Sequence, residues 1–430
     1  MNQPSPLTLE TLERAVGGEA AVIRAVTRLI PAGGQGDKVF PPTYAAGNAP
    51  LKYATEKRRI DGKEVDAVLL DSVPSQANRM EEALLMGWDS GELHFPVIGV
   101  DFSQVEGLED LDRITTLQAP HRIADALLRD SVDEAGRLFR DTVAGKAFTD
   151  ATPTNATAVY RYCPTALVFG VWDSTGPRGG LGTKFQRALT SEIVGIGAMP
   201  GVKTASRLDP TGIQANVPVY HRRDDKNDWT INDSEADKDK KSGKAVLFSR
   251  KGAEGKGKPS AINHSNVVPS IDTTAGGVTI DYAFQTTVLS LVALRRLRFQ
   301  TDVNGTRLEG EGRRNAERAA QTALAALGLA AVSYLRAQGY DLRSRSVLIP
   351  DPGGPLTLEI LPTDGGEAGR FTLTPADART LLSKAHEKAS KLAFGWEREP
   401  LKLKPAPKLA DLIRKSRELA ARGEGDDEEA

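Results

Sequence analysis

The residues best suited to chemistry surround a glycine-rich turn near the middle of the chain. Asp173, Ser174 and Thr175 end an apolar run, and glycines 176, 179, 180 and 182 follow, with Pro177 and Arg178 among them. Lys184 and Arg187 come directly after the turn. A glycine-rich turn that enters a helix N-terminus beside basic side chains suits a phosphate group. The alternative is an ordinary glycine turn next to a solvated helix face.

Two elements must position this turn. The apolar run 166–172 is short and predicts a buried strand. From about Thr183 the spacing of Phe185, Leu189 and Ile193 predicts a helix with one core face. Lys184, Arg187 and Ser191 would then lie on the opposite, cationic face.

Several catalytic and nucleotide-binding motifs are missing from the sequence. The turn fits neither the P-loop nor the dinucleotide fingerprint, because Gly182 is followed by Thr183-Lys184-Phe185. No G-x-S-x-G, H-E-x-x-H or paired-cysteine motif occurs, and Cys163 is the single cysteine. His121 and His264 have no nucleophile beside them, and Asp66, Asp71 and Asp101 are interpreted as turn or cap residues. We therefore predict no enzyme activity, catalytic residue, metal or cofactor.

Charge is unevenly distributed along the 430 residues. The formal net charge is −1, but Glu424, Asp426, Asp427, Glu428 and Glu429 carry five negative charges, and without them it is +4. This balance leaves a nucleic-acid partner open. No secretory signal pattern or apolar run of about 20 residues is present, so a cytoplasmic protein without membrane association is expected.

The N-terminal part predicts a sheet with one basic face. A short helix over 7–16 ends at two glycines, and 20–30 alternates at period two. Ala21, Ile23, Ala25 and Leu29 would point one way, and Val22, Arg24, Val26, Arg28 and Ile30 the other. A helix is the alternative for 20–30, since alanine and arginine are good helix formers. The open, arginine-bearing side would resemble sheet platforms that bind RNA.

The following segments add a loop, a strand and a helix. Residues 31–59 predict a long loop in which basic side chains such as Lys38 alternate with aromatic ones. A strand over 66–71 precedes a helix over 75–87, capped by Ser75, with Ala77, Met80 and Leu84 inward. Gln76, Asn78 and Arg79 lie in its first turn. Arg79 opposes the helix dipole unless an anion compensates it, and Glu82 is the alternative partner.

The second half of the chain contains a highly charged insertion between regular elements. We predict a strand over 202–208, a charged extension over 220–262 with a short strand at 245–249, and a strand over 278–284. A helical run over 286–299 and a long helix with the seam Leu324, Leu327, Ala331 and Leu335 follow. The last elements are a strand pair, 347–349 and 356–361, and helices over 375–394 and 407–421.

Three segments carry a family resemblance: LLDSVPSQANRMEE (69–82), ALVFGVWDSTGPRGGLGTKFQRALTSEIVG (166–195) and SRLDPTGI (206–213). Together they resemble the crRNA-binding backbone subunit of the type I-G (formerly I-U) CRISPR Cascade complex, a member of the RAMP superfamily. RLIPAGGQGDKVFPPTY (28–44) and INHSNVVPS (262–270) fit more loosely. The resemblance covers roughly residues 20–335.

The resemblance implies an α+β fold with an RRM-like (ferredoxin-like) palm, inserted finger and thumb elements, and a helical C-terminal extension. The palm would comprise 1–219 and 263–365, with 220–262 as a candidate thumb hairpin and 366–430 as C-terminal helices with an acidic tail. The implied partners are crRNA, target DNA, further copies of the chain, the large and crRNA-processing Cascade subunits, and a recruited helicase-nuclease. Backbone subunits of type I systems are regarded as non-catalytic.

These observations lead to one hypothesis and two alternatives. The hypothesis is a non-catalytic subunit that oligomerises along crRNA through phosphate contacts and presents the guide for pairing with target DNA in antiviral defence. Its RNA-binding residues would be Arg24, Arg28, Lys38, Gln76, Asn78, Arg79, Arg178, Lys184 and Arg187. One alternative is a metal-dependent ribonuclease of the same superfamily that cleaves target RNA. The other is a scaffold that meets RNA only through partners.

Overall fold

The computed structural model describes residues 4–45, 47, 49–176, 183–249, 256–398 and 401–421. The chain folds into two compact units, one of residues 1–199 and 278–410 and the other of residues 200–277 and 411–430. The fold mixes helices and strands, which confirms the predicted α+β class. The glycine turn 177–182, with Arg178, and the acidic tail lie outside the described residues.

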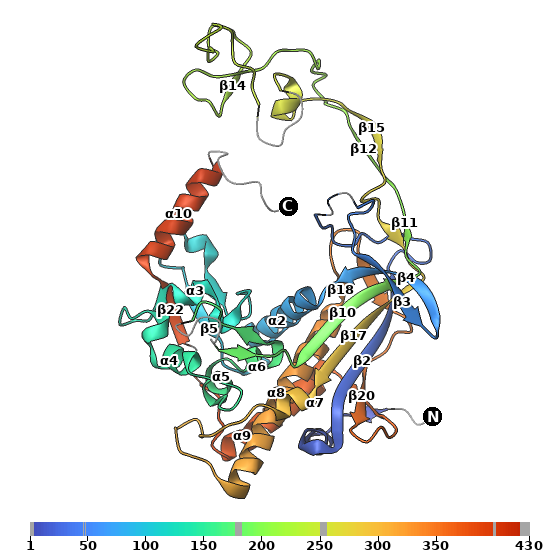
Figure 1. The fold of residues 1–430 in the computed structure, drawn as a ribbon, viewed down its shortest axis with the longest axis vertical. Coiled ribbons are helices and arrows are strands. Elements are labelled where there is room, and N and C mark those ends of the chain that lie inside the picture. The colour runs from blue at the N-terminus through green and yellow to red at the C-terminus, as the bar shows by residue number, and fades with distance from the viewer. Residues whose placement is uncertain are drawn as a thin grey trace. The chain divides into compact units, whose positions relative to one another are not determined.

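The first unit is built on a ten-stranded sheet (Figure 1). Its main path runs through β1 (Ser5–Pro6), β21 (Gly369–Leu373), β20 (Leu356–Pro362), β2 (Ala20–Pro31), β17 (Tyr282–Ser290), β10 (Leu189–Ile196), β4 (Lys63–Asp71) and β3 (Thr55–Ile60). β19 (Val347–Pro350) also pairs with β2, and β18 (Tyr340–Asp341) pairs with β19. The predicted strand pair therefore forms as two strands that both pair with β2 rather than with each other.

β2 confirms the predicted alternation. Ile23, Ala25 and Leu29 are buried, while Arg24 and Arg28 lie on the opposite face. β2 pairs antiparallel with β17 from Leu29–Ala283 to Val22–Ser290, which fixes the register of the two central strands. Because side chains alternate across a strand, this register also sets which side chains share a face of the sheet.

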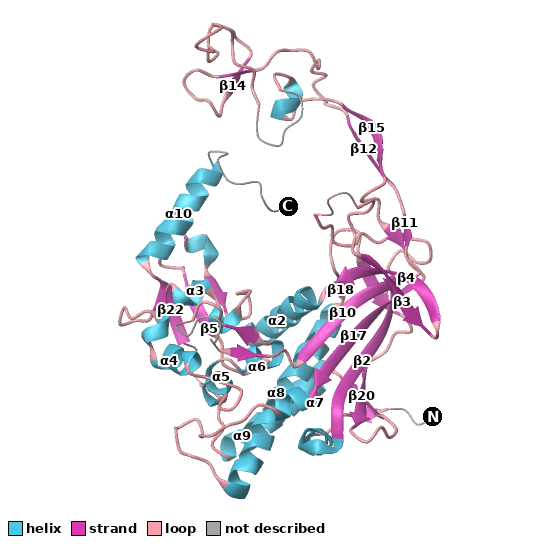
Figure 2. Cartoon of the chain, viewed as in Figure 1, coloured by secondary structure: helices cyan, strands magenta, loops and turns pink. Residues whose placement is uncertain are grey.

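Helices cover one face of this sheet (Figure 2). α2 (Val73–Asp89) contacts β10, and α8 (Gly310–Gln338) contacts β17 and packs against both α2 and α9 (Pro375–Lys391). The predicted α8 seam is buried. Smaller helices are α1 (Leu9–Arg14), the π-helical turn Ala15–Glu19, and α7 (Leu291–Arg295). In chain order β2, α2, β10, β17, α8 and β20 form a βαββαβ series whose strands lie in the order β20-β2-β17-β10.

The two elements predicted around the glycine turn are wrong. Residues Pro164–Phe169 form helix α6, and only β8 (Val171–Trp172) is extended. After the turn come β9 (Lys184–Phe185) and the long strand β10, not a helix. A spacing of four residues returns to the same face in both a helix and a strand, so Leu189 and Ile193 fit either. Ser191 consequently lies on the buried face with them.

Three further predictions need correction. Residues 286–290 extend β17, and only Leu291–Arg295 is helical, because β-branched side chains and strict burial alternation favour the strand. β3 occupies the end of the predicted 31–59 loop. The strand predicted over 278–284 is interrupted, since β16 is Val278–Thr279 and β17 begins at Tyr282.

A smaller sheet lies in the same unit. Its order is β6 (Arg113–Thr115), β5 (Ile98–Asp101), β22 (Leu401–Pro405) and β7 (Ser131–Val132). The short helices around it are η2 (Glu109–Leu111), η3 (Arg122–Ala124), α3 (Ala126–Arg129), η4 (Phe139–Asp141), α4 (Val143–Thr149) and α5 (Thr157–Tyr162). α10 (Pro407–Ala421) confirms the helix predicted over 407–421.

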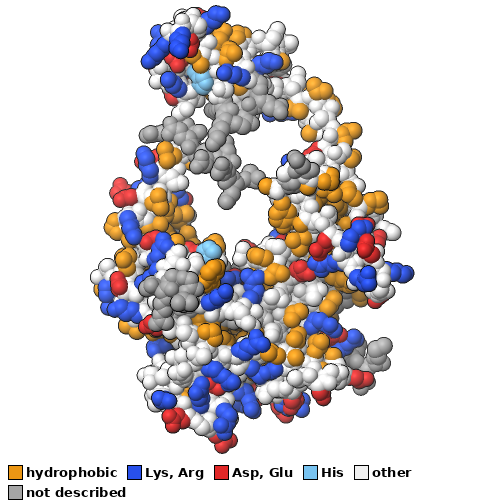
Figure 3. Space-filling view, viewed as in Figure 1, with side chains coloured by type: hydrophobic (Ala, Val, Ile, Leu, Met, Phe, Trp, Pro, Cys, Tyr) orange, Lys and Arg blue, Asp and Glu red, His pale blue; other side chains and the backbone are white. Residues whose placement is uncertain are grey.

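The second unit contains a two-stranded ribbon. β12 (Lys203–Arg207), predicted from the sequence, pairs antiparallel with β15 (Val267–Asp272). β11 (Met199–Pro200), β13 (Tyr220–His221), β14 (Trp229–Thr230) and η6 (Pro259–Ile262) are short. Residues 245–249 form only isolated bridges, at Ala245 and Leu247, instead of the predicted strand. Hydrophobic side chains are exposed along the ribbon (Figure 3).

Candidate nucleic-acid interface

The arginines on the open face of the main sheet are paired with carboxylates. Arg24 donates through Nε and Nη2 to Glu359 Oε2, at 3.0 and 2.6 Å. Arg28 pairs with Asp351, and its guanidinium lies 4.8 Å from the ring centroid of Tyr282. The predicted arginine-bearing face therefore exists, but much of its positive charge is compensated within the protein.

The start of α2 forms a buried polar cluster around Asp71. Ser72, not the predicted Ser75, caps the helix. Gln76 is fully buried: its amide donates to Asp71 Oδ2 at 2.6 Å, and its carbonyl oxygen accepts from Ser191 and Gln285. The side chain of Gln76 is fully buried and holds α2 on the sheet, so it has no surface with which to contact RNA.

Arg79 belongs to the same cluster. It donates to Asp71 at 3.0 Å and to the main-chain oxygens of Asp341 and Leu342. Asp71 is the anion that compensates Arg79, so the alternative partner Glu82 is wrong. Because these bonds engage the guanidinium inside the protein, Arg79 is not proposed as an RNA contact either. Asn78 is exposed on α2, and Lys38 lies in the loop after β2.

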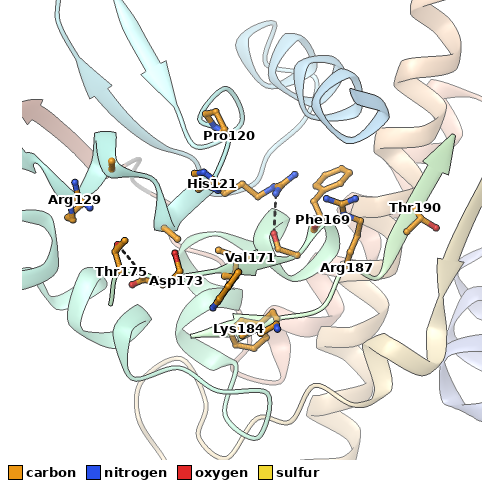
Figure 4. A pocket seen from close by; sticks show the side chains of 17 residues that line it. Pro120, His121, Arg129, Phe169, Val171, Asp173, Thr175, Lys184, Arg187 and Thr190 are labelled. Atoms are coloured by element: carbon orange, nitrogen blue, oxygen red, sulfur yellow. Dashed lines mark hydrogen bonds between the residues drawn. The ribbon is translucent and has the colours of Figure 1, made fainter. Parts of the chain in front are cut away.

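Lys184 and Arg187 lie together in a cleft of about 740 Å³ within the first unit. Figure 4 shows Arg187 and Phe169 towards one end of the cleft, and Arg129 and Thr175 towards the other. The lining comes from three segments: Pro120, His121, Arg122, Ala124, Ala126 and Arg129; Phe169 to Thr175; and Lys184, Phe185, Arg187 and Thr190. The volume lies in the range of ligand sites, about 300–1,000 Å³.

A buried ion pair builds one wall of this cleft. Arg122 Nε and Nη2 donate to the two Glu81 oxygens at 2.6 Å each, and Arg122 Nη1 donates to the Gly170 carbonyl at 3.2 Å. Burial raises the pKa of Glu81, and the Arg122 guanidinium opposes this rise. Arg122 has a φ of 53°, a backbone conformation that is uncommon outside glycine. The pair thus joins α2 to the start of η3 and to the end of α6.

Arg187, like Lys184, lines the cleft and has no acidic partner among the described residues. Its Nε donates to the Phe169 carbonyl at 3.0 Å, which leaves its other nitrogens available. Burial lowers the pKa of Arg187, Arg122 lowers it further, and Glu81 opposes both. A bound anion would relieve the cost of this half-buried charge.

Gly170 allows Arg187 to approach. The φ of Gly170 is 83°, and an added Cβ would lie 2.9 Å from the Arg187 main-chain nitrogen and 3.1 Å from the Arg187 α-carbon. Both the backbone conformation and the close approach require glycine here. The sequence shows the glycine, but its close contact with Arg187 depends on how β8 and β9 pair.

The other charged side chains of the cleft differ in how far they are compensated. Lys184 is exposed, with its ammonium 5.1 Å from the ring centroid of Trp172. Asp173 is buried and paired with Arg140 at 2.9 Å, so its negative charge is neutralised. Arg129 pairs with Asp130 at 2.8 Å. The cleft is therefore cationic mainly through Lys184 and Arg187.

Sequence reasoning missed Arg122, Arg129 and Trp172 as site residues and considered His121 only for acid–base chemistry. The local sequence does not indicate that 120–129 and 169–187 meet, because only the tertiary fold brings these segments together. No cluster of histidine, cysteine or acidic side chains in the described part of the chain could hold a metal ion. None of the helices described is long and apolar enough to cross a membrane.

The fold and the cleft together define a mixed α+β protein with a cationic cleft beside its main sheet. Residues 23–200 match the model of the family described as CRISPR-associated protein GSU0053. This part of the chain, which contains most of β2, the whole of α2 and the whole lining of the cleft, is therefore similar to a CRISPR-associated family. No curated protein matches the chain.

Proposed function

We propose that this protein is a non-catalytic, crRNA-binding backbone subunit of a type I-G CRISPR Cascade complex in the RAMP superfamily. It binds the RNA through phosphate contacts without reading its sequence, and oligomerises along it. The single observation that carries the proposal is the family match over 23–200, because that stretch contains every residue that lines the cationic cleft.

The connectivity of the main sheet supports an RRM-like palm. A βαββαβ series with two helices on one face is the ferredoxin-like pattern, and β2, α2, β10, β17, α8 and β20 follow it. The face opposite these helices carries Tyr282 and Phe284, which are partly buried, with ring centroids 4.8 Å apart, beside Arg28. Aromatic and basic side chains on such a face suit single-stranded RNA.

The charges of the cleft support phosphate binding at its Arg187 end. Lys184 is exposed and Arg187 has no carboxylate partner among the described residues, so both can pair with a polyanion. We propose these two, with Arg24, Arg28, Lys38, Asn78 and Arg178, as the RNA contacts. The carboxylates that pair with Arg24 and Arg28 would compete with RNA, which makes the cleft the principal site.

The proposed partners follow from this role. Copies of the chain bind one crRNA side by side, and the large subunit and the crRNA-processing subunit complete the complex. Recognition of target DNA is delegated to base pairing by the guide, while the protein senses backbone shape and charge. A helicase-nuclease is then recruited to the bound DNA.

The test is the double variant Lys184→Ala with Arg187→Ala in the full chain. Removing two phosphate contacts should weaken binding to several unrelated single-stranded RNAs by the same factor. The slope of log affinity against log salt should also fall by about 1.4 for a single strand. Affinity is measured by filter binding over a salt series.

A matched control removes two exposed basic residues of α9, Arg379→Ala with Lys384→Ala. It changes the net charge equally but leaves the cleft intact, so RNA affinity should change little. Equal losses in the two double variants would contradict the assignment of the cleft. Wild-type protein that does not bind RNA in isolation would favour the scaffold alternative.

The ribonuclease alternative is tested separately. Purified protein is incubated with guide-matched RNA and Mg²⁺, and we expect the RNA to stay intact. Cleavage at regular intervals would favour the metal-dependent ribonuclease.

A further inference from the structure

Trp172 stands out among the side chains that line the cleft. It is 53% exposed, although a large aromatic side chain usually contributes its surface to a core. It follows directly on Gly170 and Val171 in the segment that forms one wall. An isolated exposed aromatic residue needs no explanation, but this one is held inside a concave site beside cations.

The surroundings of Trp172 hold it in place. β8 pairs antiparallel with β9, and Trp172 lies opposite Lys184 in that register. The Lys184 ammonium lies 5.1 Å from the indole centroid, within the range of a cation–π contact. The indole is thus pre-positioned, which lowers the entropy lost when a flat ligand stacks on it.

The same cleft offers an anion partner in addition to this aromatic surface. Arg187 is three residues beyond Lys184, and its guanidinium is oriented by the Phe169 carbonyl. The one acidic side chain that lines the cleft in the described residues, Asp173, is neutralised by Arg140. The cleft therefore combines an aromatic surface with positive charge and little opposing negative charge.

We propose that this cleft binds one unpaired nucleotide of the RNA strand, with the base stacked on Trp172 and the adjoining phosphate at Arg187 and Lys184. The inference rests on the proposed function and extends it by assigning a base-stacking residue. Every base has an aromatic face, so such a contact is tolerant of sequence. It selects single strands, because a base inside a duplex is already stacked on both sides.

The test uses full-length protein and a single-stranded RNA that carries 2-aminopurine at one position. In the wild type, stacking on the indole should quench the 2-aminopurine fluorescence. Trp172→Leu keeps an apolar side chain but cannot stack, so it should abolish the quenching and weaken binding about 5- to 150-fold. Trp172→Phe should retain most of both, since it keeps an aromatic face.

Two further measurements separate stacking from charge. Trp172→Leu should leave the salt slope unchanged, whereas Lys184→Ala with Arg187→Ala lowers it. Affinity for a fully paired RNA duplex should be the same in Trp172→Leu and in the wild type. Free 5′-AMP should bind far more weakly than the strand, because it lacks the neighbouring phosphates.

The outcomes distinguish this inference from the proposed function. Unchanged affinity and quenching in a folded Trp172→Leu protein would overturn the stacking role and leave RNA binding intact. Binding of 5′-AMP as tight as that of the strand would also overturn it, in favour of a mononucleotide site. Wild-type protein that binds no RNA would overturn both. Thermal unfolding of each variant shows that it is folded.

Discussion

At the scale of single residues, the cleft depends on the buried ion pair between Arg122 and Glu81. Arg122 and Glu81 have side-chain exposures of only 8% and 3%, and each satisfies the other through two bonds. Arg187 is close enough to raise the positive potential around them. Breaking a buried pair is costly because the remaining charge stays desolvated. Glu81 therefore acts on the cleft by holding Arg122, without lining the cleft itself.

The prediction at this scale concerns Glu81→Gln. Removing the carboxylate leaves Arg122 charged and buried beside Arg187, so we expect the free energy of unfolding to fall by about 3–5 kcal/mol. Chemical denaturation at neutral pH measures it. Glu82→Gln, one residue along α2 and exposed, is the matched control and should cost little. Equal effects of the two substitutions would show that the pair does not stabilise the fold.

At the scale of elements, α9 carries a histidine that is held neutral. The His386 ring stacks on Trp396 at 4.2 Å, with an interplanar angle of 12°. Its Nε2 accepts a hydrogen bond from the Trp396 main-chain nitrogen at 3.1 Å. Burial, with a smaller contribution from Arg398, lowers the pKa of His386 to about 4. Protonation would break the accepted bond, so α9 and the segment after it are joined by a pH-sensitive contact.

The prediction for α9 is an acid-sensitive stability. The unfolded histidine titrates near its ordinary pKa of 6.5, whereas the folded one stays neutral until about 4. The contribution of His386 is therefore fully present above about pH 6.5 and is lost as the pH falls towards about 4. Its slope is at most about 1.4 kcal/mol per pH unit. Denaturant unfolding over this range measures the slope.

His386→Phe provides the comparison for this prediction. Phenylalanine can keep the stacking on Trp396 but cannot titrate. The variant should be less stable than the wild type at neutral pH, since it loses the Nε2 bond, and less sensitive to acid. An identical acid slope in both proteins would assign the sensitivity to other groups.

At the scale of the whole molecule, the second unit leaves apolar surface uncovered. A two-stranded ribbon is marginally stable in water by itself. In the ribbon of β12 and β15, Val268 is 78% and Ile271 68% exposed, and Leu208, just after β12, is 84% exposed. Large apolar side chains exposed along one ribbon are typical of a contact with another protein. In the proposed assembly, that partner is the neighbouring copy on the RNA.

The prediction for assembly is that Ile271→Glu impairs oligomerisation on RNA. A charge at this position would have to be desolvated in the contact between copies. Ser270→Glu is the matched control, because successive side chains of a strand point to opposite faces. Sedimentation of each variant with a long single-stranded RNA measures the assembly. Equal assembly by both variants would remove the ribbon face from the proposed contact.

The sequence predicts best those elements whose apolar residues follow one period along their whole length. The alternation in 20–30 predicts β2 and both of its faces, and the seam of α8 predicts a long buried helix. Such patterns are informative because burial of one face requires an apolar side chain at every second position of a strand, and at every third or fourth position of a helix. Where the spacing fits both periods, as at Leu189 and Ile193, the sequence could not distinguish a helix from β10.

The tertiary structure alone decided which charges are available to a ligand. Arg24 and Glu359 are 335 positions apart, and Arg79 meets Asp71 only because α2 folds back beside the end of β4. Pairing of this kind depends on sheet register and on helix placement, which no local pattern encodes. The same packing brings 120–129 beside Trp172 and Arg187, and so forms the cleft. The basic residues were visible in the sequence, but their partners were not.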